Sequence, residues 1–479
     1  MIIKNFKLDR DKDIYALNKD LMYFINTFVL EKEFNLILNY ISRKLNLSLE
    51  TLRFEVKICL FKNFVNNKGI FNKRLSFFYS FYYFFLLFFF FFYVFFFSKN
   101  KFLSQTCDII IDDIDANSDI LKFEILNKKK KLIFFSNVEF SQKGFSIFFF
   151  KFRGCIIKKN FFFFIINLVF KTFILNIKNN NNYNLIILYI LKNYIKYSTL
   201  FQKVKSKYLL QERFYNTSAI KDELFHQNGG IYTSVLQKNI FQINGPGMYI
   251  HADILFSLGL NSAQMVGNLG GKIKKIIPIG SFWMERDFYF HPYKNKFPCY
   301  DLMFFESDHL AQFHSGYNSY YNDYYEHFYF IRKFAIKFPT LKIAIKHKKN
   351  FNDINELKIL SDIKNVKYIV DSYDHVSDSY CLGYKAKSLF TWSSTLGYEL
   401  VGLGKVCYFL DPKNNNFSFL NNKQSINELL RVTSYEEFER NVLRSISGHI
   451  DTKIIKNKEL YCLKSNDCSD RIISTFNLI

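Results

Sequence analysis

One short stretch of the chain places hydroxyl side chains, a glycine and a carboxylate at a spacing that suits the binding of an anion. In TWSSTLGYELVGLGK, residues 391–405, Ser393, Ser394 and Thr395 stand in a row, and Glu399 follows one helical turn later. The apolar run KSLFTW precedes them, so the hydroxyls fall where a strand gives way to a helix. N–H groups at a helix N-terminus bind phosphate, and a carboxylate one turn further on can accept hydrogen bonds from both hydroxyls of a ribose.

The same residues also fit a simpler interpretation, in which they only begin a helix. Ser393 or Ser394 would then be the N-cap, and Glu399 would support the cap as the glutamate of a capping box does. The stretch by itself does not separate the two interpretations, because a cap and a phosphate use the same backbone N–H groups.

A second candidate is a strand that ends in basic residues. LKIAIKHKKN, residues 341–350, predicts a strand with Lys346 and His347 at its carboxyl end and two more lysines after it. Ligands of open parallel sheets lie beyond the carboxyl ends of the strands, so these side chains could meet the same anion. The alternative is a solvated, lysine-rich turn.

A histidine beside a pair of glycines is the third candidate. We interpret FHQNGG as the end of an apolar strand, which would let His226 act as a general base or donate to a phosphate oxygen. Asn228, Gly229 and Gly230 would form a loop beside it, because glycine permits close approach of the backbone to a ligand. A single histidine is more often structural, and that alternative stays open.

Two further stretches add weaker candidates. IIPIGSF predicts a strand that ends in a turn, where Gly280 and Ser281 would line the binding site. His251 and Asp253 are polar residues in MYIHADILFSLG, which also predicts a strand.

The elements that would position these residues alternate between strands and helices. From residue 299 to about residue 412 the pattern repeats strand and helix with short connections, and in the first half CDIIIDD and KKKKLIFFS enclose a helical stretch in the same way. Such alternation predicts doubly wound parallel sheets. We therefore expect an α/β protein with two Rossmann-like domains.

The expected organisation along the chain has five parts. Residues 1–75 mix charge with helical periodicity, and residues 76–98 form a hydrophobic segment. We assign residues 99–295 to a first α/β domain, residues 296–450 to a second, and residues 451–479 to a C-terminal helical tail.

The hydrophobic segment is a belt of phenylalanine between basic flanks. SFFYSFYYFFLLFFFFFYVFFFS has no charged side chain and is long enough to cross a hydrocarbon core of about 30 Å as a helix. The alternative is a buried core element, although such elements rarely stay uncharged over this length. We expect membrane insertion or tight attachment to a membrane surface. Two shorter Phe runs, from Phe145 and from Asn160, predict strands or amphipathic helices, and the polar first 13 residues predict no cleavable signal peptide.

The composition favours anionic partners. The chain of 479 residues has a formal net charge of +23, which suits nucleotides, phosphorylated sugars or an acidic membrane face. No zinc finger or aromatic–basic repeat is present, so we expect no nucleic acid partner. The eight cysteines have no CxxC spacing, and Asp112 and Asp113, early in the chain beside the Phe belt, are interpreted as structural. We expect no metal site.

Taken together, the candidate stretches resemble a known family. KIAIKH resembles the strand and K-x-H-P signature of GT-B-fold glycosyltransferases that build surface polysaccharides, such as capsule and lipopolysaccharide, except that Lys348 follows His347 and the proline is missing. DSYDHVSDSYCLGYKAKSLFTWSSTLGYELVGLGK resembles the block that follows, and HADILFSLGL and IIPIGSF resemble the linking segment. The resemblance covers roughly residues 222–412.

This resemblance implies two Rossmann-like domains that face a cleft, with the second binding a nucleotide-sugar donor and the first a glycan or lipid-linked acceptor. Basic residues and helix N-termini would stabilise the leaving diphosphate, without a metal or another cofactor. From the Phe belt we expect membrane association, and we expect the catalytic domains to lie in the cytoplasm. Lys346, Ser393, Ser394 and Thr395 would stabilise the leaving diphosphate, Glu399 would orient the ribose, and His347 would lie in the same donor site. His226, because of its place before two glycines, is our candidate for deprotonating the acceptor hydroxyl.

Three alternatives stay open at this point. Two are enzymes on the same scaffold, a polyol-phosphate transferase and a nucleotide-sugar 2-epimerase. A polyol-phosphate transferase would need a second anion site with more arginine or histidine than the motifs supply. The third is a non-catalytic, membrane-tethered protein that keeps a degenerate nucleotide fold.

Overall fold

The computed structural model describes most of the chain, which divides into two compact units that we treat one at a time. The first unit comprises residues 1–238, 244–255 and 266–275, and the second comprises residues 239–243, 256–265 and 276–479. The finer five-part division stays a prediction. The described residues are 14–66, 76–97, 104–112, 114, 120–151, 159–179, 181–238, 249–260, 270–290, 299–306, 318–347, 354–370, 377–392, 394–413, 429–464 and 467–477.

The second unit contains a sheet of six parallel strands. The strand order is β12-β11-β10-β13-β14-β15, and every neighbouring pair is parallel. Numbered along the chain, this is the order 3-2-1-4-5-6 of a doubly wound Rossmann sheet. The strands are β10 (Leu302–Phe305), β11 (Ile343–His347), β12 (Val366–Val370), β13 (Ser388–Thr391), β14 (Cys407–Leu410) and β15 (Arg431–Val432).

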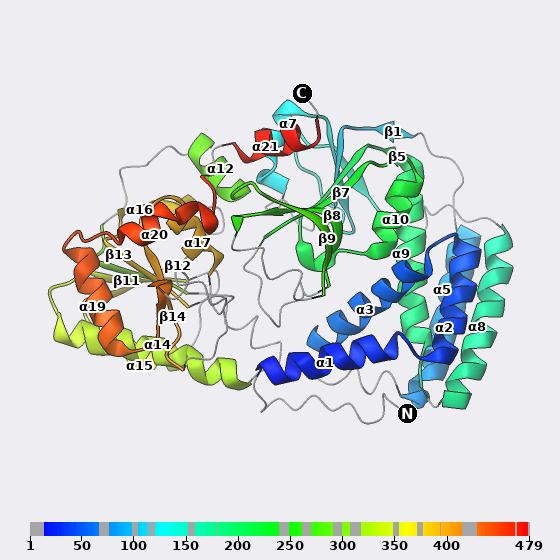
Figure 1. Ribbon diagram of the computed structural model, residues 1–479, viewed down its shortest axis with the longest axis horizontal. Coiled ribbons are helices and arrows are strands. Elements are labelled where there is room, and N and C mark those ends of the chain that lie inside the picture. Colours follow the sequence, from blue (N-terminus) through cyan, green and yellow to red (C-terminus); the bar gives the residue numbers. More distant parts are fainter. Residues whose placement is uncertain are drawn as a thin grey trace. The chain divides into compact units, whose positions relative to one another are not determined.

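Helices cover both faces of this sheet (Figure 1). Helices α14, α15 and α19 pack together, with α19 against β13, whereas α17 packs against β13 and β14 and contacts α16. Because both faces are covered, the strands are apolar along their length, and Phe304, Ile345 and Phe390 are fully buried. The helices are α12 (Phe282–Phe290), α14 (Asn318–Lys337), α15 (Ile354–Leu360), α16 (Ser377–Lys385), α17 (Thr395–Gly402), α19 (Tyr435–Ile446), α20 (Thr452–Lys456) and α21 (Cys468–Thr475).

The C-terminal segment is part of the second unit. The Ser469 backbone N–H and hydroxyl donate to the buried Glu285 carboxylate at 2.9 and 2.7 Å. Two glycines touch the same segment so closely that a Cβ on Gly259 would lie 2.5 Å from the Leu460 carbonyl oxygen, and one on Gly402 would lie 2.5 Å from the Cys462 carbonyl oxygen. These contacts join Leu460, Cys462 and Ser469 to the body of the unit.

The first unit contains a sheet with the same kind of strand order. The order is β4-β3-β2-β6-β7-β8-β9, or 3-2-1-4-5-6-7 along the chain, and the pairs β2–β3, β3–β4, β2–β6 and β6–β7 are parallel. A separate parallel pair joins β1 (Gln105–Thr106) to β5 (Val204–Lys205). The seven strands are β2 (Ile109–Asp112), β3 (Leu132–Ser136), β4 (Ile147–Phe149), β6 (Tyr208–Gln211), β7 (Tyr232–Leu236), β8 (His251–Ser257) and β9 (Lys272–Pro278).

A layer of helices belongs to the same unit. The Phe-rich helix α5 packs against α8 and α9, and α2 packs against α8 and α3 (Figure 1). Aromatic rings make much of this packing, and the Phe84 and Phe173 ring centroids lie 5.3 Å apart. The helices are α1 (Ile14–Phe28), α2 (Lys32–Leu45), α3 (Leu49–Asn66), η2 (Phe77–Tyr79), α5 (Ser80–Phe97), α7 (Glu124–Lys129), α8 (Lys159–Asn179), α9 (Asn184–Lys203) and α10 (Ala219–Gln227).

The α/β class, the two parallel sheets and the helical Phe-rich N-terminal region are as the sequence predicts. The two shorter Phe runs form β4 and α8, a strand and a helix. One predicted element is wrong: FHQNGG begins in the last turn of a helix, α10, and not at the end of a strand.

Candidate functional site

The strongest candidate site lies where the second-unit sheet reverses its strand order, between β10 and β13. In sheets of this topology, ligands bind outside the carboxyl ends of the strands at this switch point. The Thr391 hydroxyl ends β13 there, donates to the Phe305 carbonyl at 2.7 Å and accepts from the Ser394 N–H at 3.2 Å. One buried hydroxyl therefore ties the end of β10 to the turn that leads into α17.

The hydroxyl residues of the turn begin helix α17. Ser394 is the N-cap, with φ −82° and ψ 136°, and its side chain makes no capping hydrogen bond. Thr395 is the first helical residue, and Ser393 lies outside the described residues. A Cβ on Gly397 would lie 2.7 Å from the Phe409 ring, so this glycine allows α17 to pack closely on the sheet. A phosphate role for these residues stays a prediction.

Glu399 joins a residue more than one hundred positions away in the sequence. The Ser281 hydroxyl donates to Glu399 Oε1 at 2.5 Å and also accepts from the Met284 N–H at 3.4 Å at the start of α12. Gly280 immediately before it has φ +90°, a conformation that favours glycine. The structure thus brings together three residues that the sequence assigned to one site, and Glu399 is 93% buried. Glu399 also lies beyond the N3 position of α17, so it does not complete a capping box.

The basic strand end of β11 is buried among carboxylates. Lys346 and His347 are almost fully buried. His347 Nδ1 lies 3.2 Å from Glu306 Oε2, and its Nε2 lies 2.8 Å from Glu356 Oε1. Because a carboxylate only accepts, both ring nitrogens carry a proton in this arrangement. An anion-binding role for His347 stays a prediction, and these contacts weigh against it.

The electrostatics agree with a charged His347. Burial lowers the pKa of this histidine, but the hydrogen bonds to Glu306 and Glu356 outweigh it, so the pKa is raised above its ordinary value. The ring also lies over that of Tyr368, with centroids 5.5 Å apart and planes 22° from parallel. His347 holds β10, β11 and α15 together through one cation.

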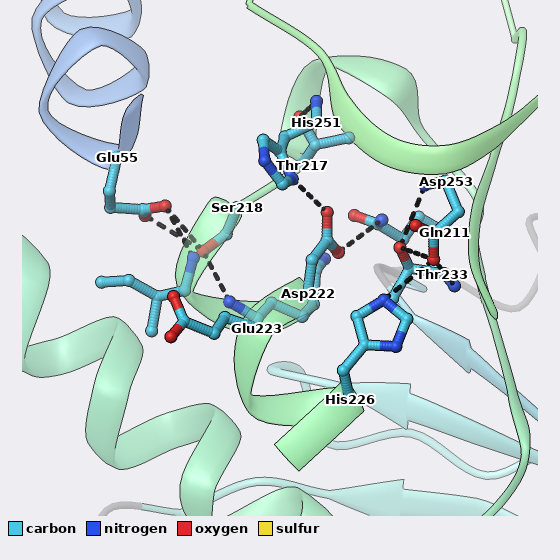
Figure 2. A network of polar contacts seen from close by, with 12 residues as sticks. Glu55, Gln211, Thr217, Ser218, Asp222, Glu223, His226, Thr233, His251 and Asp253 are labelled. Atoms are coloured by element: carbon cyan, nitrogen blue, oxygen red, sulfur yellow. Dashed lines mark hydrogen bonds and ion pairs between the residues drawn. The ribbon is translucent and has the colours of Figure 1, made fainter. Parts of the chain in front are cut away.

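His226 belongs to a polar network in the first unit (Figure 2). Its Nε2 lies 2.9 Å from Asp253 Oδ2, and its Nδ1 lies 3.0 Å from the Gly230 carbonyl oxygen. The Asp253 hydrogen bond is the main reason that the His226 pKa is raised. Burial would raise the pKa of Asp253, but hydrogen bonds from His226, Lys274 and the Thr233 N–H hold it well below its usual range. The two residues form a charged pair.

The position of His226 follows from the connection that carries it. The chain leaves the carboxyl end of β6, passes through α10 and enters the amino end of β7, which is parallel to β6. His226 and the turn of Asn228, Gly229 and Gly230 therefore lie at the amino edge of β7, and Gly229 has φ +87°. Ligands of such sheets bind at the opposite, carboxyl edge. This placement weighs against His226 as the acceptor base, a role that stays a prediction.

The weaker candidate His251 takes part in the same network. Its Nδ1 lies 2.7 Å from Asp222 Oδ2, and Asp222 is buried in the first turn of α10 (Figure 2). Burial raises the pKa of Asp222, and His251 opposes that effect. Ser218 at the N-cap donates to Glu55 of α3 at 2.9 Å, so the network fixes α10 between α3 and the strands.

Three residues of the second-unit site were missed by the sequence analysis. Thr391 lies inside the quoted stretch but reads as the end of an apolar strand, and Glu306 directly follows β10 in YDLMFFES. An acidic residue that ends a buried strand is a usable signal for Glu306. Glu356 carries no such signal, because its contact with His347 depends on how α15 packs. Among the described residues, no group of three histidine, cysteine or acidic side chains could hold a metal ion, and metal independence stays a prediction.

Comparison with known proteins gives fold likenesses only. No protein-family model and no curated protein matches the chain. Among solved structures, the chain is similar to UDP-GlcNAc 2-epimerase from Neisseria meningitidis bound to UDP-GlcNAc, with 12% identity, a TM-score of 0.44 and coverage of 78% of this chain and 100% of that one. MurG of Acinetobacter baumannii has 9% identity, a TM-score of 0.44 and coverage of 78% and 100%. The wall teichoic acid polymerase TagF has 9% identity, a TM-score of 0.39 and coverage of 78% and 88%. Likenesses at this level do not identify the function, which has to be argued from the residues of this chain.

Proposed function

We propose that the chain is a glycosyltransferase that moves a sugar from a nucleotide-sugar donor to a surface polysaccharide or a lipid-linked glycan. The observation that carries the proposal is the switch point of the second-unit sheet, where the β13–α17 turn, Glu399 and Ser281 come together. This is the location at which a doubly wound sheet binds a nucleotide. The motifs that resemble surface-polysaccharide glycosyltransferases fall on the same elements.

The donor would bind with its diphosphate at the N-terminus of α17. Ser394 and Thr395 would supply hydroxyls, and the helix N-terminus favours negative charge. Thr391 would hold the turn in place through its bond to the Phe305 carbonyl. Lys346 lies at the carboxyl end of β11, which is adjacent to β10 in the sheet. Its buried positive charge would also attract the diphosphate. Such preorganised charge stabilises the leaving nucleoside diphosphate when the glycosidic bond breaks.

Glu399 would orient the donor through the ribose. The Ser281 hydroxyl fixes one carboxylate oxygen, which limits the rotamers that the glutamate can adopt. Replacing Glu399 by Gln removes the charge and keeps the shape. Because hydrogen bonds to a charged group contribute about 1.5–3 kcal/mol, we expect nucleotide affinity to fall by roughly tenfold or more.

A thermal-shift panel of nucleotides and nucleotide sugars tests the proposal. A ligand that binds only the folded state raises the unfolding midpoint, so one plate identifies the base. The matched variant is Glu399→Gln, with Glu436→Gln on the surface of α19 as a control for the loss of one charge. Unchanged affinity in Glu399→Gln would remove the ribose role, and no response to any nucleotide would remove the donor site.

Product analysis separates the rival functions. A glycosyltransferase releases the nucleoside diphosphate only when it breaks the bond to the sugar, whereas a 2-epimerase returns an altered nucleotide sugar without an acceptor. A polyol-phosphate transferase would release a nucleoside monophosphate instead. Binding without any of these products would favour the non-catalytic alternative.

The helical layer of the first unit supports attachment to a membrane. Within the described residues, one helix is long and apolar enough to cross a membrane by length and composition, at Phe77–Val94. It packs against α8 and α9, and apolar side chains of α5 and α8 remain exposed, with Phe89 at 64% and Phe163 at 72%. Lys171 and Lys178 of α8 would complement anionic lipids. Among the described side chains of α5 and α8, the other exposed apolar residues are Phe81, Tyr82, Phe85, Phe88, Phe92, Phe170, Ile174 and Ile177.

Membrane fractionation tests the attachment. We expect the chain to sediment with membranes at neutral pH, and a carbonate wash then distinguishes the two modes. Retention after the wash indicates a span, and release indicates attachment through the exposed face of α5 and α8. A chain that stays soluble before the wash would contradict the attachment.

A further inference from the structure

The Phe-rich helix α5 is buried along one narrow stripe only. Its buried side chains follow one another at steps of three or four residues, so they lie on one side of the helix. They are Ser80, Tyr83, Leu87, Phe91 and Val94. Phe81 and Phe88 lie on another side, seven residues apart, with 47% and 43% exposure. A helix that leaves this much aromatic surface uncovered is suited to a further apolar partner.

Helix α8 lies antiparallel beside α5 and extends the same apolar surface (Figure 1). The Phe81 and Phe173 ring centroids are 5.3 Å apart near the start of α5, whereas Phe91 lies 6.1 Å from Phe161 near its end. Residue numbers therefore fall along α8 as they rise along α5. The exposed Phe170 ring lies 6.5 Å from the Phe84 ring, so the exposed sides of the two helices meet.

The helix behind α5 is part of the body of the first unit. Helix α9 packs against α5, and its Lys192 Nζ lies 5.1 Å from the centroid of the Phe90 ring, beside the second half of α5. Asn193 of α9 donates to the buried Glu55 carboxylate of α3 at 2.6 Å. If α5 crossed a bilayer, Lys192 would enter the hydrocarbon core beside it, which is costly for a charged side chain. The packing therefore opposes a span.

Lysines accompany the apolar residues on the exposed side of α8. Lys171 directly follows Phe170, and Lys178 directly follows Ile177 and also pairs with Glu33. Lysine keeps its charged end at the level of the lipid headgroups while its apolar stem lies beside the acyl chains. Apolar side chains with lysines among them suit the boundary between headgroups and acyl chains, where amphipathic helices lie about 5–10 Å deep.

We propose that α5 and α8 lie parallel to the membrane and bind a single leaflet that contains anionic lipid, so that the Phe belt does not cross the bilayer. The inference rests on the membrane attachment in the proposed function and specifies its mode and the lipid chemistry. The exposed apolar side chains enter the acyl boundary, and Lys171 and Lys178 meet anionic headgroups. Helix α9 and the sheet stay on the aqueous side.

Two tryptophan variants, Phe81→Trp and Phe88→Trp, test the orientation. They are bound to vesicles of phosphatidylcholine and phosphatidylglycerol whose acyl chains carry bromine at a known depth, which quenches nearby tryptophan. The wild type gives the background from Trp283 and Trp392, which belong to the second unit. The two sites are about 10 Å apart along the axis of α5. A helix parallel to the surface gives equal quenching at both, strongest from bromine near the headgroups.

A spanning helix gives a different result in the same experiment. Phe88 would then lie near the bilayer centre, about 10 Å deeper than Phe81, because α5 rises about 1.5 Å per residue. Bromine near the chain ends would quench the Phe88 variant most and the Phe81 variant least. That depth difference would overturn the proposal and leave the membrane attachment itself in place.

Phe89→Glu and Phe163→Glu test whether this surface makes the contact. Each should weaken vesicle binding by about tenfold or more, because an anion replaces an apolar side chain at the acyl boundary. The matched control is Tyr329→Glu, which changes an exposed aromatic residue of α14 in the second unit and should leave vesicle binding unchanged. Equal losses in all three variants would overturn the proposal.

A wild type that does not sediment with vesicles would overturn both the attachment and its mode. Light scattering then shows whether the same surface joins two copies of the chain. Nucleotide binding is measured without lipid, so a failure of the donor site would contradict the proposed enzyme and would leave the vesicle results unchanged.

Discussion

The two sheets share a strand order but differ in what their carboxyl edges present. The edge of the second unit carries hydroxyls and carboxylates, with Thr391, Glu306 and Glu399 beside one buried lysine. The edge of the first unit carries Lys122, Arg213 and Lys238 around the Glu212 carboxylate. The same backbone topology thus presents two edges that differ in the charge of their side chains.

A comparison inside the first unit gives the largest expected effect. Lys221→Met removes a fully buried cation that pairs with the buried Asp112 carboxylate, so we expect a loss of about 3–5 kcal/mol in the free energy of unfolding. Lys238→Met removes a partly exposed lysine from a carboxylate that keeps two other cations, so the loss should stay under about 1 kcal/mol. Chemical denaturation of both variants measures the difference, and equal losses would mean that the two groups are equivalent structural pairs.

Two histidines with raised pKa values offer a smaller effect with a defined sign. A folded-state pKa above the unfolded value stabilises the protein below the unfolded pKa of about 6.5, and this stabilisation is lost as the pH rises through the folded-state pKa. The free energy of unfolding should therefore fall between pH 6.5 and alkaline pH. Because His347 is buried and His226 is partly exposed, His347→Gln should flatten this fall more than His226→Gln does. Denaturation curves measured across pH 6–9 test this order of effects. A larger change in the His226 variant than in the His347 variant would contradict the prediction.

The smallest expected effect concerns the hydroxyl that fixes Glu399. Ser281→Ala removes a hydrogen bond to a charged carboxylate, and we expect nucleotide affinity to fall by roughly three- to tenfold. Chemical denaturation of the same variant measures its free energy of unfolding separately from nucleotide affinity. An affinity loss that appears only together with a large loss of stability would show that the substitution acts through general stability.

The second-unit elements were predictable because local pattern and tertiary environment agree there. Helix α14 and the buried parallel strands of LKIAIKH and KSLFTW follow the alternation of helices and strands that the sequence predicts after residue 299. The pattern also placed Ser394 at the start of α17. The sequence pattern did not predict that Glu399 pairs with Ser281 or that His347 pairs with two glutamates. Such contacts depend on how elements that are distant in the sequence pack together.

The misassignment of FHQNGG shows how an error in one element changes a functional argument. Helix α10, which holds His226 in its last turn, has only nine residues, and its apolar Ile220, Leu224 and Phe225 resemble a buried strand when taken without periodicity. The signal that identifies the helix is Ser218, whose side chain accepts from the Lys221 N–H as an N-cap. With a helix in place of the expected strand, His226 lies at the amino edge of the sheet and not at its carboxyl edge. This position weakens the argument that His226 is catalytic.

The close contacts of residues 460–476 with the second unit have a consequence for synthesis of the chain. The Glu285 carboxylate gains its Ser469 partners, and Gly259 and Gly402 gain their backbone neighbours, only when this segment is present. On the ribosome, domains generally fold as units and the N-terminal one folds first. The first unit has most of its sequence available early, whereas the nucleotide-binding candidate site would mature only after residue 476 has emerged. Until then, nascent chains would expose the apolar surface that Phe256 shares with Phe476, and would depend on chaperones that shield such surfaces.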